Sequence, residues 1–170
     1  SSDLTTAAAQ AGAANAKLRI GTMDGVFKMQ TNPEAVALAK KVGLAGVQVT
    51  LGRPKAGEST MSLENRELQK AWVAASKQHD VPLNSTYLDV LHQDCLKDSD
   101  AAMTWVRKGI IVTKNLGAPV LMMVFFGKCQ VLQRREFDRV VGLSRELAAE
   151  PEKAGVILGF ENTSSGADNR

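Results

Sequence analysis

The sequence predicts a parallel α/β fold, because short apolar segments alternate along the chain with longer segments of helical period. Successive apolar segments begin roughly 28 to 37 residues apart, a spacing that fits one strand, one helix and the return to the next strand. Segment 119–126 contains no polar side chain, which indicates a strand buried on both faces. The predicted strands are residues 18–23, 46–51, 82–87, 119–126 and 156–161.

The helical segments between these strands have recognisable ends. The first begins with Asn32 as its N-cap and Pro33 in its first turn, and Gly43 predicts its end. Apolar side chains recur at helical spacing in every segment, so one face of each helix is expected to cover the sheet. The other helices are expected at about residues 65–79, 99–117 and 133–149, with Pro151 after the last.

Two architectures fit this alternation, an open doubly wound parallel sheet and part of a (β/α)8 barrel. A complete barrel takes about 250 residues, so five units in 170 residues would form only part of one. The turn at 24–28 (DGVFK) has neither the GxGxxG nor the GxxxxGK[ST] pattern, which disfavours a nucleotide site. The residues alone leave both architectures open.

The composition is that of one globular domain, with 44% hydrophobic and 23% charged residues. The net charge of +3 is too small to favour a nucleic-acid or membrane-surface partner, and no apolar run is long enough to cross a bilayer. Residues 1–16 are small and polar, so we expect a flexible arm before a domain at 17–170. An Ala- and Ser-rich arm also suits a chain whose signal peptide was removed, so cytoplasmic and exported locations both stay open.

The cysteines, Cys95 and Cys129, lie far apart in the sequence without a CxxC pattern. This excludes a thiolate zinc site built on that pattern. Because sequence separation does not give the distance between two sulfur atoms, we expect two free thiols, with a single disulfide as the alternative.

Polar residues near the carboxyl ends of the predicted strands are the candidates for a functional site, since ligands of parallel α/β folds bind there. Glu161 ends an otherwise apolar strand, where a carboxylate either pairs with a cation or binds a metal. Asp24 and His92 follow the first and third strands and are candidates for substrate contact, with solvation as the alternative. Lys128 follows the fourth strand and is a candidate to bind a phosphate or carboxylate through its charge, with an ordinary surface lysine as the alternative. Tyr87 is expected to pack in the core, with stacking on a sugar as the alternative.

Three segments resemble the sugar phosphate isomerase/epimerase family, namely KLRIGT at 17–22, KKVGLAGVQVTLG at 40–52 and GVILGFEN at 155–162. The resemblance covers about 17–170. It implies a xylose-isomerase-like TIM barrel of which this chain holds about the first five βα units, with truncation after the fifth.

The resemblance also implies a divalent metal ion (Mn, Mg, Co or Zn), held in that family by a glutamate ending strand five and by three ligands on later strands. Of these ligands only Glu161 has a counterpart, so an incomplete metal site is expected, with Glu161 also as the catalytic base. Gln48 stands where many relatives have a glutamate, and its amide is expected to contact a sugar hydroxyl.

The activity implied is that of a sugar or sugar-phosphate isomerase or epimerase, by metal-assisted proton transfer beside a carbonyl. Epimerisation needs acid/base groups on both faces of the reacting carbon, so the activity is expected to be incomplete in these residues. The alternative is a non-catalytic carbohydrate-binding or vestigial barrel domain. A related DNA-repair nuclease is disfavoured by two histidines and the small net charge. Open edges at the first and fifth strands favour a homo-oligomer.

Overall fold

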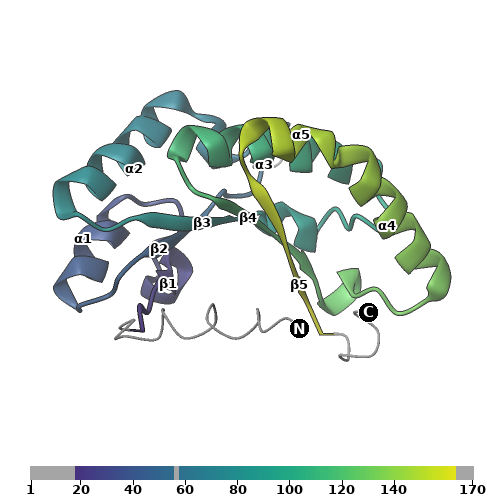
Figure 1. Ribbon diagram of the computed structural model, residues 1–170, viewed down its shortest axis with the longest axis horizontal. Helices are drawn as coiled ribbons and strands as arrows, with labels where there is room; N and C mark the ends of the chain where they lie inside the picture. Colours follow the sequence, from purple (N-terminus) through teal and green to yellow (C-terminus); the bar gives the residue numbers. More distant parts are fainter. Residues whose placement is uncertain (1–17, 56–57, 164–170) are drawn as a thin grey trace, which may run out of the picture.

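The computed structural model describes residues 18–55 and 58–163, which form one sheet of parallel strands flanked by helices (Figure 1). The arm predicted at 1–16 lies outside the described residues. Each strand falls within or next to its predicted segment, although only the last two residues of segment 18–23 pair with the neighbouring strand. The strands are β1 (Thr22–Met23), β2 (Val47–Thr50), β3 (Leu83–Tyr87), β4 (Val120–Phe125) and β5 (Ile157–Asn162).

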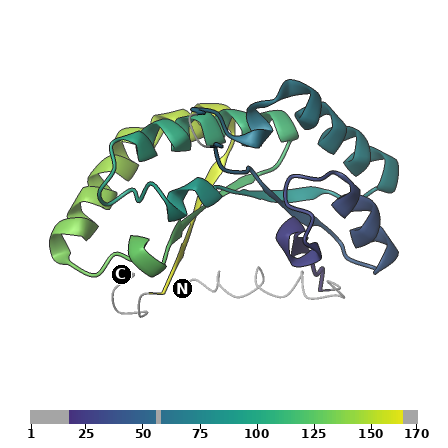
Figure 2. The same ribbon diagram turned by 180° about the vertical axis from the view of Figure 1, so that it is seen from behind.

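The order of the strands decides between the two predicted architectures. The sheet runs β1-β2-β3-β4-β5, with every neighbouring pair parallel. In a doubly wound sheet, the order of the strands reverses at an inner strand, and helices cover both faces of the sheet. Here the helices lie along one side of the sheet and arch over it, as both views show (Figures 1 and 2). The open doubly wound alternative is therefore wrong, and the described residues form the five parallel strands of a partial TIM barrel together with the helices between them.

The helices begin and end where local chemistry favours it. The Asn65 side chain accepts hydrogen bonds from the backbone amides of Glu67 and Leu68, which caps the second helix. Gly117 ends the third helix with a φ of 69°, in the left-handed region that favours glycine. No helix among the described residues combines the length and apolarity that crossing a bilayer requires. The helices are α1 (Glu34–Lys41), α2 (Arg66–His79), α3 (Ala101–Leu116), α4 (Arg134–Leu147) and α5 (Ala149–Ala154).

The fourth helical segment differs from its prediction. Instead of one helix that ends before Pro151, the chain forms α4 and then the short helix α5, which includes Pro151. Proline is tolerated in a first helical turn, because a backbone N–H there has no intrahelical partner to lose. Pro151 therefore lies inside a helix without breaking it, and it is buried.

The hydrophobic core lies between the sheet and the helices. Thr86 of β3 contacts Thr113 of α3, with 2.6 Å between their hydroxyl oxygens. Gly109 lets α3 lie close to β4, since a Cβ at that position would be 3.1 Å from Leu121. Thr86 and Leu121 are paired in register, so both face the helices. Because side chains alternate along a strand, the next residues, Tyr87 and Met122, point to the opposite face.

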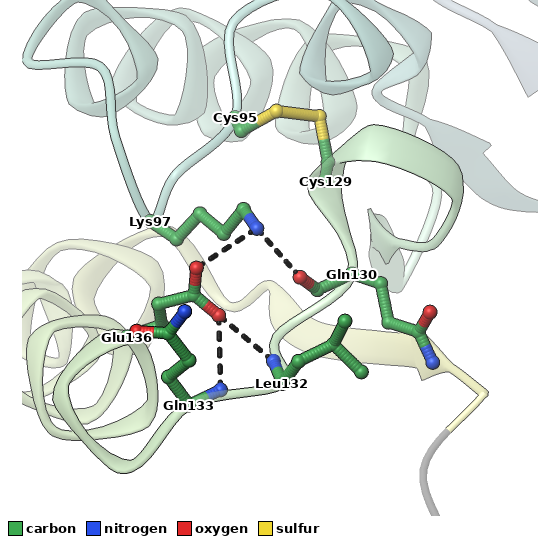
Figure 3. Close-up of polar contacts among 7 residues, drawn as sticks. All are labelled: Cys95, Lys97, Cys129, Gln130, Leu132, Gln133 and Glu136. Carbon is green, nitrogen blue, oxygen red and sulfur yellow. Dashed lines mark hydrogen bonds and ion pairs between the residues drawn. A yellow bond between two sulfur atoms is a disulfide. The ribbon is translucent and has the colours of Figure 1, made fainter.

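A disulfide joins Cys95 and Cys129, so the prediction of two free thiols is wrong (Figure 3). The Cα atoms are 5.0 Å apart, although 34 positions separate the residues in sequence. Cys95 follows the 3-10 turn η3 (Asp89–His92), and Cys129 ends the 3-10 turn η4 (Gly127–Cys129). The bond therefore connects the loops that follow β3 and β4.

An ion pair reinforces the same connection (Figure 3). Lys97 Nζ is 2.8 Å from the Gln130 carbonyl oxygen and 3.0 Å from Glu136 Oε1. The other Glu136 oxygen accepts hydrogen bonds from the backbone amides of Leu132 and Gln133, the two residues that precede α4. The side chains of Lys97 and Glu136 are only 11% and 13% exposed, so this pair is well shielded from solvent. The two loops form one rim beside the carboxyl ends of β3 and β4.

Both edges of the sheet stay open within the described residues. β1 pairs only with β2, and β5 pairs only with β4. Ile157 and Phe160 of β5 are 64% and 47% exposed. Such edges favour association with another strand, and the homo-oligomer stays a prediction.

Replacing both cysteines with alanine should lower the free energy of unfolding by about 2 to 4 kcal/mol, because a disulfide restricts the unfolded chain. Urea unfolding of the oxidised protein and of the double variant measures the difference. Dithiothreitol should lower the midpoint of the wild-type protein and leave that of the variant unchanged. An unchanged wild-type midpoint under dithiothreitol would contradict a stabilising role for the bond.

Stability should also depend on the ionisation of Glu136. Hydrogen bonds from the amides of Leu132 and Gln133, followed by Lys97, lower the pKa of Glu136 from 4.5 to about 2. The folded-state pKa is the depressed one, so the stabilisation is complete above pH 4.5 and is lost as the pH falls toward 2. The stability difference between wild type and Glu136→Gln should shrink over this interval, as followed by urea unfolding at several pH values. The exposed Glu152→Gln on α5 is the control, and a pH-independent difference would contradict the assignment.

Candidate functional site

The carboxyl ends of the strands bring several polar side chains to the face of the sheet that lies away from the helices. Tyr87 is on this inner face, and it pairs in register with Thr50 and Met122. Glu161 pairs with Val124, two residues beyond Met122, and therefore shares the inner face. The inner face at this end of the sheet is thus the candidate site.

Tyr87 and His92 form a hydrogen-bonded pair at its centre. The Tyr87 hydroxyl oxygen is 2.7 Å from His92 Nε2. The His92 ring also meets the ring of Phe126 edge-on, with 5.0 Å between the ring centroids. Both members of the pair are half-buried. The pair thus presents two polar groups beside an aromatic wall.

An ion pair lies next to these rings. Arg53 Nε is 3.1 Å from Asp89 Oδ2, and Asp89 is the more buried partner, with side-chain exposures of 42% and 12%. Asp89 Oδ1 is buried and has no hydrogen-bond partner among the described residues. Burial raises the pKa of Asp89, and the positive charge of Arg53 opposes that rise.

The side chain of Glu161 is exposed, but its charge reaches the central pair. Burial raises the pKa of Tyr87 to about 12, and the charges of Glu161 and Asp89 add to the effect, against Arg53. The phenol therefore stays protonated at neutral pH. Burial, together with Arg53, lowers the pKa of His92, whereas Glu161 opposes that change. The imidazole is therefore largely neutral at pH 7.

Asp24 has a different environment from the other candidates. It is fully buried, and its carboxylate accepts hydrogen bonds from the backbone amides of Thr31 and Thr50 at 3.0 and 3.1 Å, and from the Thr50 hydroxyl. Burial raises the pKa of Asp24, and these hydrogen bonds oppose the rise. The contacts fix the turn after β1 against β2, which is a structural role. Its predicted contact with substrate stays untested.

The structure does not bring all of the predicted residues together. Gln48 lies on β2, where its amide nitrogen donates to the Ser85 hydroxyl at 3.0 Å. Lys128 is exposed on η4. Only His92 and Glu161, among the five predicted residues, are electrostatically coupled at the centre of the site.

Sequence reasoning missed the partners of these two residues. Tyr87 was expected to pack, and Arg53 carried no motif that marks it. One signal was available in the sequence. Tyr87 is the last residue of a strand, and His92 follows it by five residues, at the end of a single 3-10 turn that brings the two side chains together.

The donors present do not make a metal site by themselves. Among residues 18–55 and 58–163, no group of three or more His, Cys, Asp or Glu side chains could hold a metal ion. Glu161 was the expected carboxylate ligand, and the carboxylate of Asp89 already forms an ion pair with Arg53. The described residues therefore do not fit the expected divalent ion on their own.

Comparison with known proteins identifies the fold as that of the xylose-isomerase-like barrels. No family model and no curated protein sequence matches the chain. Among solved structures, a xylose isomerase domain protein from Planctomyces limnophilus matches with a TM-score of 0.63 at 12% identity, over 88% of this chain and 55% of that one.

Two similar structures are named as sugar epimerases. The 3-keto-D-glucoside 4-epimerase from E. coli has a TM-score of 0.62 at 12% identity, covering 85% of this chain and 56% of that one. The D-allulose 3-epimerase from Methylomonas sp. has a TM-score of 0.62 at 14% identity, covering 84% of this chain and 51% of that one. The chain thus spans about half the length of the structures that it matches.

The position of Glu161 can be tested through Tyr87, because the chain has only one tyrosine. Glu161→Gln should lower the pKa of Tyr87 from about 12, since it removes a negative charge that disfavours tyrosinate. Near-ultraviolet absorbance of tyrosinate, recorded against pH, reports this value. Glu152→Gln should leave the titration unchanged. If Glu161→Gln also left it unchanged, Glu161 would lie away from the inner face.

Proposed function

We propose that the inner face binds a small sugar and that the chain carries part of a sugar isomerase or epimerase. The observation that carries this proposal is that Glu161 shares the inner face of the sheet with the hydrogen-bonded Tyr87–His92 pair, at the carboxyl ends of the strands. The solved structures that share the fold support it, since they include a D-allulose 3-epimerase in complex with D-allulose and a D-psicose 3-epimerase in the presence of D-fructose.

The proposed chemistry is proton transfer at a carbon beside a carbonyl. Glu161 is exposed and has the chemistry of a general base, which takes the proton from that carbon. The electron pair of the C–H bond moves into the adjacent carbon–oxygen system and forms an enediol or enediolate. Tyr87 stays protonated at neutral pH, so its hydroxyl can hydrogen-bond the oxygen on which charge develops.

Glu161 is the described residue that we propose as a ligand for a divalent metal ion. The other ligands would come from outside the described residues. The donors among the described residues do not hold the ion by themselves.

A non-catalytic carbohydrate-binding domain is the second candidate. The neutral Tyr87–His92 pair favours it, because neutral hydroxyl and imidazole groups bind sugar hydroxyls without any need for catalysis. The same residues would then bind the sugar, and Glu161 would only accept a hydrogen bond.

We also propose that the protein is exported. The Cys95–Cys129 bond supports this location over the cytoplasm, because disulfides form and persist mainly in oxidising compartments.

Exchange of sugar protons with solvent separates these candidates. D-Allulose incubated with the protein in D2O should lose the proton on the carbon beside its carbonyl, as followed by NMR. Glu161→Gln should reduce the exchange rate by about 100-fold or more, because it removes the base. Glu152→Gln on α5 is the matched control and should exchange like wild type.

Binding is measured in parallel by titration calorimetry with D-allulose and D-fructose, with and without Mn2+. Binding without proton exchange, in the presence of the metal as well as in its absence, would support the carbohydrate-binding domain. If neither sugar bound under either condition, both candidates would be rejected.

A further inference from the structure

We propose that the groove between α2 and α3 is a docking surface for an acidic amphipathic helix of another protein. This groove has a volume of about 480 Å³ and is lined by residues of both helices. It is separate from the candidate site, which lies on the inner face of the sheet, because the helices lie along the other face (Figures 1 and 2). The inference is therefore independent of the proposed function.

The groove offers apolar surface to a partner. Val73 and Ala74 of α2 line it, together with Asn115 of α3. Ile111 lies one helical turn before Asn115, on the same side of α3, and is 57% exposed. The apolar side chains of an amphipathic helix can pack into the groove that two neighbouring helices form.

A hydrogen-bonded glutamine connects the two helices at the groove. Asn115 Nδ2 donates to Gln69 Oε1 at 3.0 Å, and Gln69 Nε2 donates to the Leu63 carbonyl oxygen at 2.6 Å. Gln69 is only 6% exposed, so its contacts are shielded from water. The groove is already formed in this chain, so binding there requires little ordering of its residues.

The groove is also remote from the open edges of the sheet in the order of the strands. α2 and α3 connect β2 to β3 and β3 to β4, which are inner strands, whereas the open edges are β1 and β5. A strand that pairs with either edge would therefore leave the groove uncovered. The occupant that the proposal requires is a separate molecule.

Positive side chains follow one side of the groove. Arg66, Lys70 and Lys77 of α2 line it and are exposed, and their spacing of four and seven residues keeps them on one side of the helix. None of the described residues that line the groove is acidic. Lys70 pairs with the exposed Glu67, whereas Arg66 and Lys77 form no ion pair with any described residue. A row of carboxylates on a partner helix would complement these charges.

Two of these cations are unfavourable for the isolated fold. Arg66 lies in the first turn of α2, where the helix dipole disfavours a positive charge. Arg66 and Lys70 are like charges four residues apart, so they repel each other across one helical turn. Side chains that break local rules without a compensating contact are typical of functional surfaces. Carboxylates of a bound helix would supply that contact.

The experiment uses a synthetic helical peptide of about 18 residues, which forms five turns. It carries leucine at the i, i+3, i+4 and i+7 spacing, glutamate on both flanks of this stripe and alanine elsewhere. A second peptide has glutamine in place of every glutamate, and a third has the residues of the first in scrambled order. Fluorescence anisotropy of the labelled peptides measures their binding to the protein.

We expect the acidic helix to bind about 10-fold more tightly than either of the other two peptides, through several exposed ion pairs and one matched apolar face. Its advantage over the glutamine peptide should shrink as sodium chloride rises from about 50 to 300 mM, because salt screens exposed charges.

Variants locate the peptide on the protein. Arg66→Gln/Lys77→Gln should weaken binding of the acidic helix by about 5- to 10-fold, because it removes two cations. The exposed pair Arg135→Gln/Lys153→Gln, on α4 and α5, makes the same change of charge and should bind like wild type. Ile111→Ala should weaken binding by about 3- to 5-fold through lost apolar contact. Arg66→Gln alone should not lower the midpoint of urea unfolding, since the charge is unfavourable in the free protein.

Each opposite result overturns the inference. Equal binding of the scrambled peptide would show attraction by net charge alone, and equal losses in the two double variants would place the peptide elsewhere on the chain. If citrate displaced the peptide far better than sodium chloride at the same ionic strength, the groove would be a site for a small polycarboxylate instead. A lower urea midpoint in Arg66→Gln would show that Arg66 serves the fold. If the acidic helix did not bind, the docking surface would be rejected, whereas the sugar experiments would be unaffected.

Discussion

The arrangement of the site depends on one topological constraint, the parallel alignment of consecutive strands in sequential order. Because the strands are parallel, their carboxyl ends lie at the same edge of the sheet, and because the helices lie along one side, the inner face of each strand is turned away from them (Figure 2). Residues from β3, from the turn after it and from β5 meet there although they lie far apart in the sequence. The chemistry follows from this alignment rather than from any local motif.

Much of the fold was predictable because burial leaves a simple trace in the sequence. The apolar segment around β4 and the glycine that ends α3 indicate a buried strand and a helix end from local chemistry alone. The two-residue length of β1 was not predictable, because it depends on which backbone groups β2 can pair. The prediction that the helix ends before Pro151 was wrong for a related reason. A proline breaks a helix in its interior but not in its first turn, and Pro151 lies in the first turn of α5.

The candidate site was less predictable because its residues act through spatial neighbours. Glu161 is conspicuous in the sequence as an acid after an apolar strand, and the structure places it on the inner face. Tyr87 looks like a packing residue until His92 is seen to return to its hydroxyl. Asp24 is the opposite case. It follows a strand, as a site residue would, but its carboxylate accepts hydrogen bonds from the backbone amides of Thr31 and Thr50. The disulfide likewise required the distance between two loops.

The disulfide also bears on how the chain reaches its native state. The segment between Cys95 and Cys129 contains α3 and β4, so the bond needs only one helix and one strand to be in place before the sulfur atoms meet. These 170 residues contain two cysteines, so they can form only one disulfide among themselves. Oxidation of this segment therefore needs no reshuffling to reach its native pairing.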